Sequence, residues 1–585
     1  MFLKQIKIEH GLFHNLKLEK IMIKKLSELL TVFDYKLVSF DGKTEYTTLP
    51  FNPEIKGLAF DSRNVKEDFI FFALPGTHTT GNIFIPKAIK NGATVIIFQD
   101  QIDENTAIQI KNELDSINKN VVFINVKDSR YVMAPISAHF YDNPSEKLIV
   151  IGVTGTEGKS STVSFVWQLL QLSSHKAGFI STVQYSLGDE AISNPEHQTT
   201  PEATIIQRQL YEMVQNKCEY AVVETSSHGL SPKLNRTGSL LFDCGIFMNV
   251  TLEHLEFHGT FQQYRNDKAN LFRKLDEHNH IKIINGEKRQ VPSFGIINLE
   301  DPSAEYFLKA TNQLVIGFTT KGKAGKSAEN TQIDLPPIPK NIPVIFGTNI
   351  ESSKQGLSFD FSYTENYQEN HSSNSQLIHV DSSLPGAFNT YNLMAAIMAV
   401  SKLTNNSANN IAEFVKNVIP VKGRMTVINQ QQPFELIIDY AHTPSSFETI
   451  FPPIRKRCTG KMIAVFGSGG ERDLKKRPLQ GEIAAKFCDI VILADEDPRG
   501  ENPEELLNMI AEGAQKLGKQ INQNLYIIPD RPKAIRKALQ LAQENDIVLL
   551  LGKSHENSII YKDYIMPYDE IEEAKKALDE MGYKK

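Results

Sequence analysis

One segment near residue 150 limits the possible folds of this 585-residue chain more than any other feature. The sequence LIVIGVTGTEGKSSTVSFVWQLL (148–170) places an apolar run before a glycine-containing loop, and the loop before a helical pattern. Glycines let backbone N–H groups surround phosphate oxygens, and a following helix N-terminus adds its dipole. The order strand, loop, helix therefore predicts an α/β domain that binds a nucleotide.

The loop also carries the side chains that phosphate chemistry requires. We expect Lys159 to contact the β- and γ-phosphates and Ser160 to ligate Mg²⁺. The consensus GxxxxGK(S/T) requires glycine at position 153, where this chain has valine, but the rest of the order is intact. We therefore favour phosphate binding over an ordinary glycine-rich turn. The residues of this phosphate loop are Gly155, Thr156, Glu157, Gly158, Lys159, Ser160 and Ser161.

Two other glycine-containing segments do not predict a nucleotide site. Gly552-Lys553-Ser554 also follows an apolar strand, but it lacks upstream glycines and no helical pattern follows at once, so we interpret it as a turn. The segment from Gly467 to Gly470 departs from the GxGxxG pattern, so we expect no nicotinamide cofactor.

Alternating apolar runs and helical patterns extend beyond this segment and predict an α/β fold with parallel strands. The expected strands outside the nucleotide segment are 93–98, 120–126, 434–440, 461–467, 489–495 and 546–552. We place domain boundaries where the alternation restarts, which gives an N-terminal domain at 22–147, a central domain at 148–421 and a C-terminal domain at 422–585. Between 279 and 383 the pattern loosens, and we expect solvated loops at 319–332 and 364–376.

Composition excludes several classes of protein. Lys and Arg total 63 and Asp and Glu total 69, a net charge of −6, so nothing in the overall charge favours binding to nucleic acid or to an anionic membrane. The purely apolar runs are too short for a transmembrane helix. The four cysteines lie far apart in sequence, which fits a reducing cytoplasm.

The first residues differ from the rest. Residues 1–21 mix charged and isolated apolar residues, a pattern of neither a signal peptide nor an anchor. The segment IMIKKLSELL (21–30) has an amphipathic helical pattern that begins beside Met22. Translation from Met1 and translation from Met22 both stay open, and 1–21 is treated as a possible extension.

Candidate metal ligands follow two further apolar runs. YAVVETSSHGL (220–230) ends its apolar run at Glu224, and ligands in open α/β sheets bind beyond the carboxyl ends of strands. His254 and His258 follow FDCGIFMNV (242–250), but the zinc metalloprotease pattern needs Glu after the first His, and Leu255 stands there. Glu224 is therefore placed to hold a metal beside the nucleotide, although a Glu at a strand end is more often simply solvated, and we do not expect zinc.

Several of these segments together resemble a known family. Their order in the chain is the order found in Mur ligases, and they are most similar to the members that add the third residue of the peptidoglycan stem peptide. DSR (61–63) and ALPG (73–76) resemble the uridine-nucleotide domain of those members. The matching segments are GVTGTEGKSS (152–161), HQTTPEA (197–203), ETSSHGL (224–230), FMNVTLEHLEFHG (247–259), YRNDKANLF (264–272), LPGAFNTYNLMAA (384–396), GRM (423–425), DYAHTP (439–444) and GSGGERDLKKRP (467–478).

The resemblance implies roles for the residues of the central domain. Lys159 and Ser160 would bind ATP and Mg²⁺, and Glu224 and His254 would complete the metal sites. Lys268 matches the lysine that the family carbamylates to N6-carboxylysine. A neutral amine that adds CO₂ becomes an anion, which can ligate a second Mg²⁺.

The resemblance also implies nucleotide and dipeptide contacts. The residues expected to contact adenine, phosphate and ribose are Asn392, Arg424 and Asp439, and His442 lies in the same motif as Asp439 without an assigned role. The residues expected to bind UDP-MurNAc-L-Ala-D-Glu are Ser62, Arg63, Thr199, Thr200, Ser226 and Arg236. Two positions depart from the family pattern, because the spacing before Arg236 is about two residues longer and Glu157 replaces a usual Asn.

Two signals conflict over the incoming amino acid. Arg472 matches the arginine that binds its carboxylate, a natural bidentate pairing. Arg499 suits the second carboxylate of meso-diaminopimelate, whereas Asp497, which stands where the diaminopimelate form has Asn, would attract the side-chain ammonium of lysine or ornithine. Glu556 would face an amine in either case, and Gly552 belongs to the same site. The sequence leaves the amino acid open.

The resemblance implies an ATP-dependent, cytoplasmic amide ligase that forms an acyl phosphate on the D-Glu carboxylate and then adds a diamino acid. We expect it to act as a monomer. Two alternatives stay open: a folylpolyglutamate synthase, which resembles Mur ligases in its core but would not need a uridine-nucleotide domain, and a regulatory relative without catalysis. Against the latter stand the intact Lys159, Glu224, His254 and Lys268.

Overall fold

A computed structural model describes residues 22–76, 80–117, 119–194, 198–251, 253–321, 342–353, 356–364 and 377–584. The possible extension 1–21, His197 and most of the predicted loops 319–332 and 364–376 lie outside these residues. The chain divides into two compact units, which we describe separately. The first consists of Met1–Pro144, Glu202–Tyr211 and Pro232–Ser239, and the second of Ser145–Pro201, Glu212–Ser231 and Leu240–Lys585.

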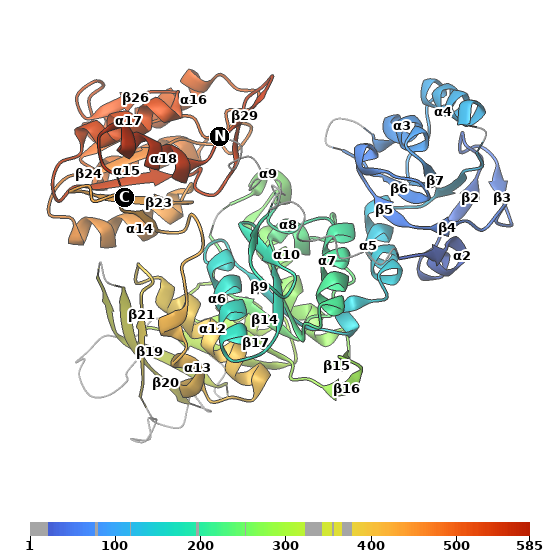
Figure 1. Ribbon diagram of the computed structural model, residues 1–585, viewed down its shortest axis with the longest axis horizontal. Helices are drawn as coiled ribbons and strands as arrows, with labels where there is room; N and C mark the ends of the chain where they lie inside the picture. Colours follow the sequence, from blue (N-terminus) through green and yellow to red (C-terminus); the bar gives the residue numbers. More distant parts are fainter. Residues whose placement is uncertain are drawn as a thin grey trace, which may run out of the picture. The chain divides into compact units, whose positions relative to one another are not determined.

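The described part of the first unit has a sheet of six strands in the order β3-β2-β8-β7-β6-β5. Figure 1 shows this sheet in blue. Strands β5 to β8 are parallel, and β2 is antiparallel to both of its neighbours. The strands predicted at 93–98 and 120–126 are confirmed as β7 and β8. The elements are β2 (Lys36–Val38), β3 (Glu45–Tyr46), β5 (Gly57–Ala59), β6 (Phe69–Ala73), α3 (Ile85–Lys90), β7 (Ala93–Phe98), α4 (Glu104–Ile117), β8 (Val122–Asn125) and α5 (Ser129–Phe140).

The amphipathic helix expected at 21–30 is wrong in extent. Only one α-helical turn forms, α2 (Leu26–Leu29), between the short strand β1 (Lys24–Lys25) and a 3₁₀ turn. Strand β1 pairs with β4 (Glu54–Ile55), and the Leu26 N–H donates to the carbonyl of Pro53 at 3.0 Å. Backbone hydrogen bonds to another segment therefore replace the hydrogen bonds of the first helical turn that the local pattern favours.

The central sheet of the second unit has eleven strands within the described residues, in the order β12-β11-β10-β13-β9-β14-β17-β18-β19-β20-β21. The strands from β10 to β19 are parallel, which confirms the predicted arrangement, but antiparallel strands extend both edges. The bounds are β9 (Ile149–Thr154), β10 (Ala177–Ile180), β11 (Gln184–Ser186), β12 (Ile192–Ser193), β13 (Tyr220–Glu224), β14 (Cys244–Phe247), β17 (Phe294–Asn298), β18 (Leu314–Thr319), β19 (Val344–Ser352), β20 (Leu357–Thr364) and β21 (Ile378–Ser382).

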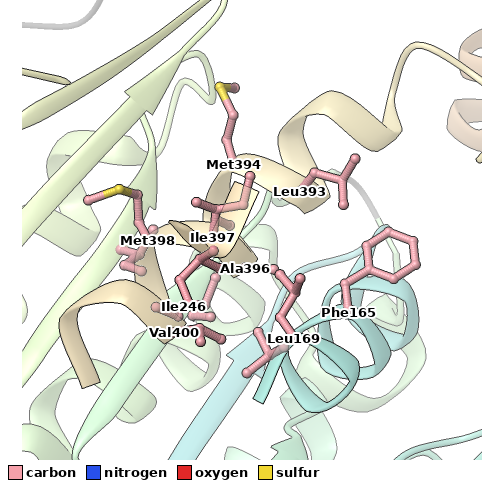
Figure 2. Packing of buried hydrophobic residues seen from close by; sticks show 14 of the residues in the cluster. Phe165, Leu169, Ile246, Leu393, Met394, Ala396, Ile397, Met398 and Val400 are labelled. Carbon is pink, nitrogen blue, oxygen red and sulfur yellow. The ribbon is translucent and has the colours of Figure 1, made fainter. Parts of the chain in front are cut away.

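Two helices bury much of this sheet's core. Helix α6 (Lys159–Leu172) follows the phosphate loop, and α12 (Asn389–Thr404) packs beside it. Figure 2 shows Phe165 and Leu169 of α6 close to Leu393 and Ala396 of α12, and all four side chains are buried. Burial of large apolar side chains contributes about 1.5–3 kcal/mol each, so this contact holds the start of α6, and with it the phosphate loop, against the sheet.

Further helices and a hairpin complete the central region. Helix α10 carries Lys268, and its neighbours α8 and α9 carry parts of the predicted site. The elements are α7 (Ala203–Gln215), α8 (Ser227–Leu230), α9 (Leu255–His258), α10 (Phe261–Arg273), β15 (Ile281–Ile284), β16 (Glu287–Gln290), α11 (Ala304–Leu308) and α13 (Ala408–Ala412).

The C-terminal sheet has the order β22-β23-β27-β24-β25-β26 in the part of the chain that the structure describes. The four strands predicted from 434 onward are confirmed as β23, β24, β25 and β27, which are parallel. The elements are β22 (Thr426–Ile428), β23 (Glu435–Asp439), α14 (Pro444–Arg457), β24 (Met462–Phe466), α15 (Lys476–Phe487), β25 (Ile490–Leu493), α16 (Pro503–Lys516), β26 (Leu525–Ile527), α17 (Arg531–Leu541), β27 (Ile547–Leu551), β28 (Ser558–Ile560), β29 (Ile565–Pro567) and α18 (Glu570–Glu580). Among the described residues, none of the helices has the length and apolar character needed to span a membrane.

Candidate active site

The phosphate loop connects β9 to α6 as predicted. Gly158 has φ +82°, and a Cβ there would lie 2.7 Å from Asn392 Oδ1, so the position requires glycine. The backbone N–H of Thr156 donates to the Asn249 carbonyl at 2.9 Å, and that of Glu157 donates to Asn249 Oδ1 at 2.8 Å. Asn249, which follows β14, therefore fixes the loop, a role that the sequence analysis did not assign.

Ser160 and Glu224 meet at the carboxyl ends of two adjacent strands. Glu224 is the last residue of β13 and pairs in register with Val153 of β9. Ser160 Oγ donates to Glu224 Oε1 at 3.0 Å. The other carboxylate oxygen accepts from Ser181 Oγ at 2.5 Å and from the Thr182 N–H at 2.9 Å. The carboxylate is buried but fully hydrogen-bonded, and its oxygens and the Ser160 hydroxyl are the hard ligands that Mg²⁺ prefers.

Two lysines reach the same loop. Lys159 Nζ donates to the Thr156 carbonyl at 2.7 Å, and Lys268 Nζ donates to the Gly155 carbonyl at 2.6 Å. Lys268 is only 2% exposed, and its Nζ lies 4.6 Å from the ring centroid of Tyr264. Burial, with the nearby Lys159 ammonium, lowers the pKa of Lys268 well below its usual value. A neutral amine is thereby favoured at this position.

His254 lies in an acidic and aromatic environment at the start of α9. It has φ +55°, and its Nδ1 lies 3.3 Å from Glu256 Oε1. Its ring packs edge-on against His228 at 4.9 Å between centroids. Burial raises the pKa of Glu253, but His254, His442 and other nearby cations lower it more, so the net shift is downward. The segment thus gathers negative charge beside the phosphate loop.

His258 does not join His254 in a shared site. Its Nδ1 lies 2.8 Å from Asp267 Oδ2 and its Nε2 lies 3.0 Å from Ser227 Oγ. Asp267 also accepts from Gln263 Nε2 at 2.8 Å, and because a carboxylate only accepts, His258 Nδ1 is the donor in its contact with Asp267. This buried chain of hydrogen bonds connects α8, α9 and α10, the helix of Lys268.

A pocket of about 350 Å³ brings together the residues predicted for the nucleotide. Arg424 Nη2 donates to Ser160 Oγ at 3.3 Å. Asp439 accepts from the N–H groups of Met425 and Ala441, both at 2.8 Å, and burial raises its pKa. The predicted residues that line this pocket are Glu157, Gly158, Ser161, Asn392, Arg424 and Asp439.

His442 follows strand β23, three residues after Asp439. Its Nδ1–H donates to the Tyr440 carbonyl at 2.8 Å, and its Nε2 lies 3.8 Å from Glu253 Oε1. Burial lowers the pKa of His442, which favours the neutral ring.

Two of the residues predicted to bind the dipeptide lie together next to Glu224. Thr200 Oγ1 lies 3.0 Å from Ser226 Oγ and donates to the Glu224 carbonyl at 2.9 Å. The Ser226 N–H donates to Thr200 Oγ1 at 2.8 Å. Thr199 is half-buried beside them.

The first unit holds the other predicted substrate residues. Arg63 is exposed and pairs with Asp61 through Nη2 at 2.5 Å, while Ser62 is buried in the same 3₁₀ turn. Arg236 Nη2 donates to Glu202 Oε1 at 2.9 Å.

The residues predicted for the amino acid are mostly gathered around the turn after β27. Arg499 has φ +54°, and its Nη1 donates to the Gly470 carbonyl at 3.1 Å. Gly552 has φ +95°, and a Cβ there would meet Glu496 Oε2 at 2.8 Å. Tyr440 OH donates to Glu556 Oε1 at 3.2 Å. Asp497 contacts Lys553, which the sequence analysis had placed in an ordinary turn.

Arg472 lies apart from this cluster. Its side chain is 43% exposed, and its Nη1 lies 3.7 Å from Glu256 Oε1 of α9. A loosely paired guanidinium on an exposed loop is available to a ligand carboxylate.

Comparison with known proteins gives a consistent result over most of the chain. Residues 54–141 match the model described as "Mur ligase family, catalytic domain", residues 153–400 the "Mur ligase middle domain", and residues 423–554 the "Mur ligase, glutamate ligase domain". The chain is 49% identical to the UDP-N-acetylmuramyl-tripeptide synthetase of Treponema denticola over 90% of this chain and 92% of that protein.

Two further comparisons agree. The UDP-N-acetylmuramoyl-L-alanyl-D-glutamate–2,6-diaminopimelate ligase 1 of Clostridium acetobutylicum is 33% identical over 92% of this chain and 97% of its own length. A solved structure of a UDP-N-acetylmuramoyl-L-alanyl-D-glutamate–2,6-diaminopimelate ligase has a TM-score of 0.53 at 24% identity, covering 90% of this chain and 95% of that one. This structural likeness supports the fold.

Proposed function

The chain belongs to the Mur ligase family, and from that premise we propose that it is the ATP-dependent ligase that adds a diamino acid to the D-Glu side-chain carboxylate of UDP-MurNAc-L-Ala-D-Glu in peptidoglycan synthesis. The main support for this proposal is the hydrogen bond from Ser160 of the phosphate loop to Glu224, next to the pocket of about 350 Å³. The names of the relatives favour this reaction over a folylpolyglutamate synthase or an inactive regulator.

The three predicted domains divide the work in this proposal. Residues 22–147 bind the UDP-MurNAc part with Ser62 and Arg63, residues 148–421 bind ATP, and residues 422–585 bind the amino acid. The restart of the α/β pattern near 148 and 422 and the positions of the three family matches support these boundaries.

Lys159 is the group that we expect to act on the transferred phosphoryl group. ATP would occupy the pocket, with Asn392 near adenine, Asp439 near ribose and Arg424 near phosphate. Lys159 would lie against the γ-phosphoryl oxygens as that group passes to the D-Glu carboxylate, and a fixed cation stabilises the charge that develops there. The diamino acid's amine then attacks the acyl phosphate, and phosphate leaves.

The residues around Ser160 fit a magnesium ion. Ser160 and Glu224 supply oxygens 3.0 Å apart, and His254 and a carbamate on Lys268 would add further ligands. A bound Mg²⁺ would neutralise charge on the phosphoryl oxygens. Ser181 and Thr182 orient the Glu224 carboxylate, so its direction does not depend on the ion.

Lys268 is suited to carbamate formation. Its lowered pKa favours the neutral amine, and a neutral amine can add CO₂ with loss of a proton to give the anionic N6-carboxylysine. Lys159, which lowers the pKa of Lys268, would then stabilise the new anion.

The substrate residues and the setting complete the proposal. Thr199, Thr200, Ser226 and Arg236 hold the dipeptide, and Arg472, Asp497, Arg499, Gly552 and Glu556 form the amino-acid site. The enzyme acts as a cytoplasmic monomer without nucleic-acid partners. Its amino acid is meso-diaminopimelate, lysine or ornithine.

A ligation screen tests the proposal. Purified protein is incubated with ATP, Mg²⁺, UDP-MurNAc-L-Ala-D-Glu and each of the three diamino acids, and phosphate release and product mass are measured. We expect phosphate release that depends on both the nucleotide substrate and one of the amino acids. Turnover only with a reduced folate and glutamate would establish the folylpolyglutamate synthase alternative, and nucleotide binding without turnover would establish the regulatory one.

A further inference from the structure

The turn Gly552-Lys553-Ser554 contains a lysine that points inward. Lys553 is 1% exposed, and its Nζ lies 2.8 Å from Asp497 Oδ1 and 2.5 Å from Glu556 Oε2. The two carboxylates come from different segments, since Asp497 follows β25 and Glu556 lies three residues beyond the lysine. One ammonium thus joins two residues of the proposed amino-acid site.

The Asp497 carboxylate is also held by the backbone. Its Oδ1 accepts from the Ile560 N–H at 3.0 Å, and the Arg499 N–H donates to the Ile560 carbonyl at 2.9 Å. The Arg499 guanidinium stands 4.0 Å from Asp497 Oδ2, at the limit of an ion pair. Through Asp497 and Ile560, Lys553 is therefore connected to the loop that carries Arg499.

Electrostatics favour this arrangement. Burial by itself lowers the pKa of Lys553, but contacts with Glu556 and Asp497 outweigh burial and raise it. Burial raises the pKa of Glu556, whereas Lys553 opposes that rise. Removing one partner of a buried pair leaves an uncompensated charge, so loss of Lys553 would disturb both carboxylates.

On the basis of the proposed function, we propose that Lys553 is a positioning residue for the incoming diamino acid, because its ammonium holds the carboxylates of Asp497 and Glu556 in place. Asp497, held by Lys553, orients the Arg499 loop through the backbone of Ile560 and does not itself read the side chain of the substrate. This assignment differs from one of the two alternatives that the sequence left open, in which Asp497 attracts the substrate ammonium directly.

Kinetics of full-length variants test this role. Lys553→Met keeps the length of the side chain and removes its charge, and Lys553→Arg keeps the charge. We expect Lys553→Met to raise the KM for the diamino acid about 10- to 100-fold, as loss of charge-assisted hydrogen bonds does. The KM values for ATP and UDP-MurNAc-L-Ala-D-Glu should stay within about twofold, and Lys553→Arg should recover part of the loss.

A matched control separates this from loss of an ordinary ion pair. Lys575 pairs with Glu572 at 2.8 Å, also three residues apart, on the exposed face of α18. Lys575→Met should leave all three KM values unchanged. Equal changes in all three KM values of Lys553→Met, or a lower melting temperature with unchanged KM values, would overturn the positioning role.

A double variant gives an independent result. If Asp497 serves Lys553, then Asp497→Asn added to Lys553→Met removes the uncompensated carboxylate and recovers part of the affinity for the diamino acid. Additive losses would overturn the proposal, and this comparison also decides it if Lys553→Met alone folds poorly. Wild-type ligation in the same assay establishes the proposed function, so its absence is distinguishable from failure of the Lys553 inference.

Discussion

Two buried lysines of the second unit, one on helix α10 and one just after strand β27, have pKa values shifted in opposite directions. Lys268 is 2% exposed and donates to the Gly155 carbonyl, and burial lowers its pKa well below the usual value. Lys553 is 1% exposed but contacts two carboxylates, and its pKa is raised. The extent of burial is the same, so the partners decide whether the amine is neutral or charged.

Lys282 is a third buried lysine of the second unit. Lys282 Nζ pairs with one carboxylate oxygen, Asp243 Oδ2, at 2.8 Å and also donates to two carbonyls. Burial lowers its pKa, and the single carboxylate only partly offsets this. The series indicates that one counter-ion does not compensate for complete burial here, whereas two do. The lowered pKa favours the neutral amine at Lys268, and the raised pKa favours the charged amine at Lys553.

Lys268→Ala should have the largest effect. If Lys268 becomes an anionic carbamate, its loss removes charge stabilisation worth several kcal/mol, and turnover should fall by more than about 10³-fold. Acetate or formate should restore part of the activity because each supplies the missing anionic oxygens. The measurement is ligation rate against added carboxylate, with crystallographic density on Lys268 as the direct observation of the carbamate.

Lys274 provides the control for this prediction. It lies just beyond the C-terminus of α10 and pairs with the exposed Glu277 at 3.2 Å. Lys274→Ala should retain wild-type turnover. Full activity in Lys268→Ala would show that a carbamate on Lys268 is not needed for the reaction.

Lys159→Ala should have the next largest effect. Lys159 lies on the phosphate loop and lowers the pKa of Lys268. Removing this cation leaves developing charge unshielded, a loss of about 10²–10³-fold in turnover. Single-turnover phosphate release measures it, and wild-type-like turnover in a folded variant would contradict the ATP-site assignment.

Arg499→Ala and Asp497→Asn test the proposed amino-acid site around Lys553. A charge-assisted contact in a closed site contributes about 1.5–3 kcal/mol, or roughly 10- to 150-fold. If the substrate is meso-diaminopimelate, Arg499→Ala should raise its KM by that factor and change lysine use little. Asp497→Asn should lower kcat/KM by a similar factor for lysine or ornithine alone if Asp497 reads the ammonium, and equally for all diamino acids if it serves Lys553.

The parts of the site that could be predicted from sequence are those that lie close together in the chain. The phosphate loop needs a strand, glycines and a helix within 23 residues, and each of these leaves a local pattern. The parallel strands were predictable for the same reason, because they are continuous apolar runs.

Contacts between distant segments left no such pattern. Asn249 binds the phosphate loop across 93 positions, and Lys553 reaches Asp497 across 56. The sequence Gly-Lys-Ser after a strand does not show whether the lysine side chain is exposed or buried. Similarly, the 21–30 pattern predicts a helix, but pairing of β1 with β4 takes its backbone partners.

The smallest expected effect concerns the stability of the fold and the buried carboxyl group of Asp495. Asp495 is 4% exposed and its Oδ2 accepts from Tyr561 OH at 3.0 Å, so a neutral hydroxyl is its hydrogen-bond partner. Burial raises its pKa to about 6 from 3.8. The native state therefore holds this proton more tightly than the unfolded state, and stability falls as pH rises from about 4 to 6.

Asp495→Asn removes that cost and keeps an acceptor for Tyr561. We expect Asp495→Asn to be more stable than wild type by roughly 1–3 kcal/mol above pH 6 and to lose this advantage near pH 4, measured by urea unfolding across that range. Asp563→Asn, in the exposed turn between β28 and β29, should change stability by less than about 0.5 kcal/mol at every pH. A destabilised Asp495→Asn at pH 7 would mean that the carboxylate of Asp495 is compensated by a charge, as the amine of Lys553 is.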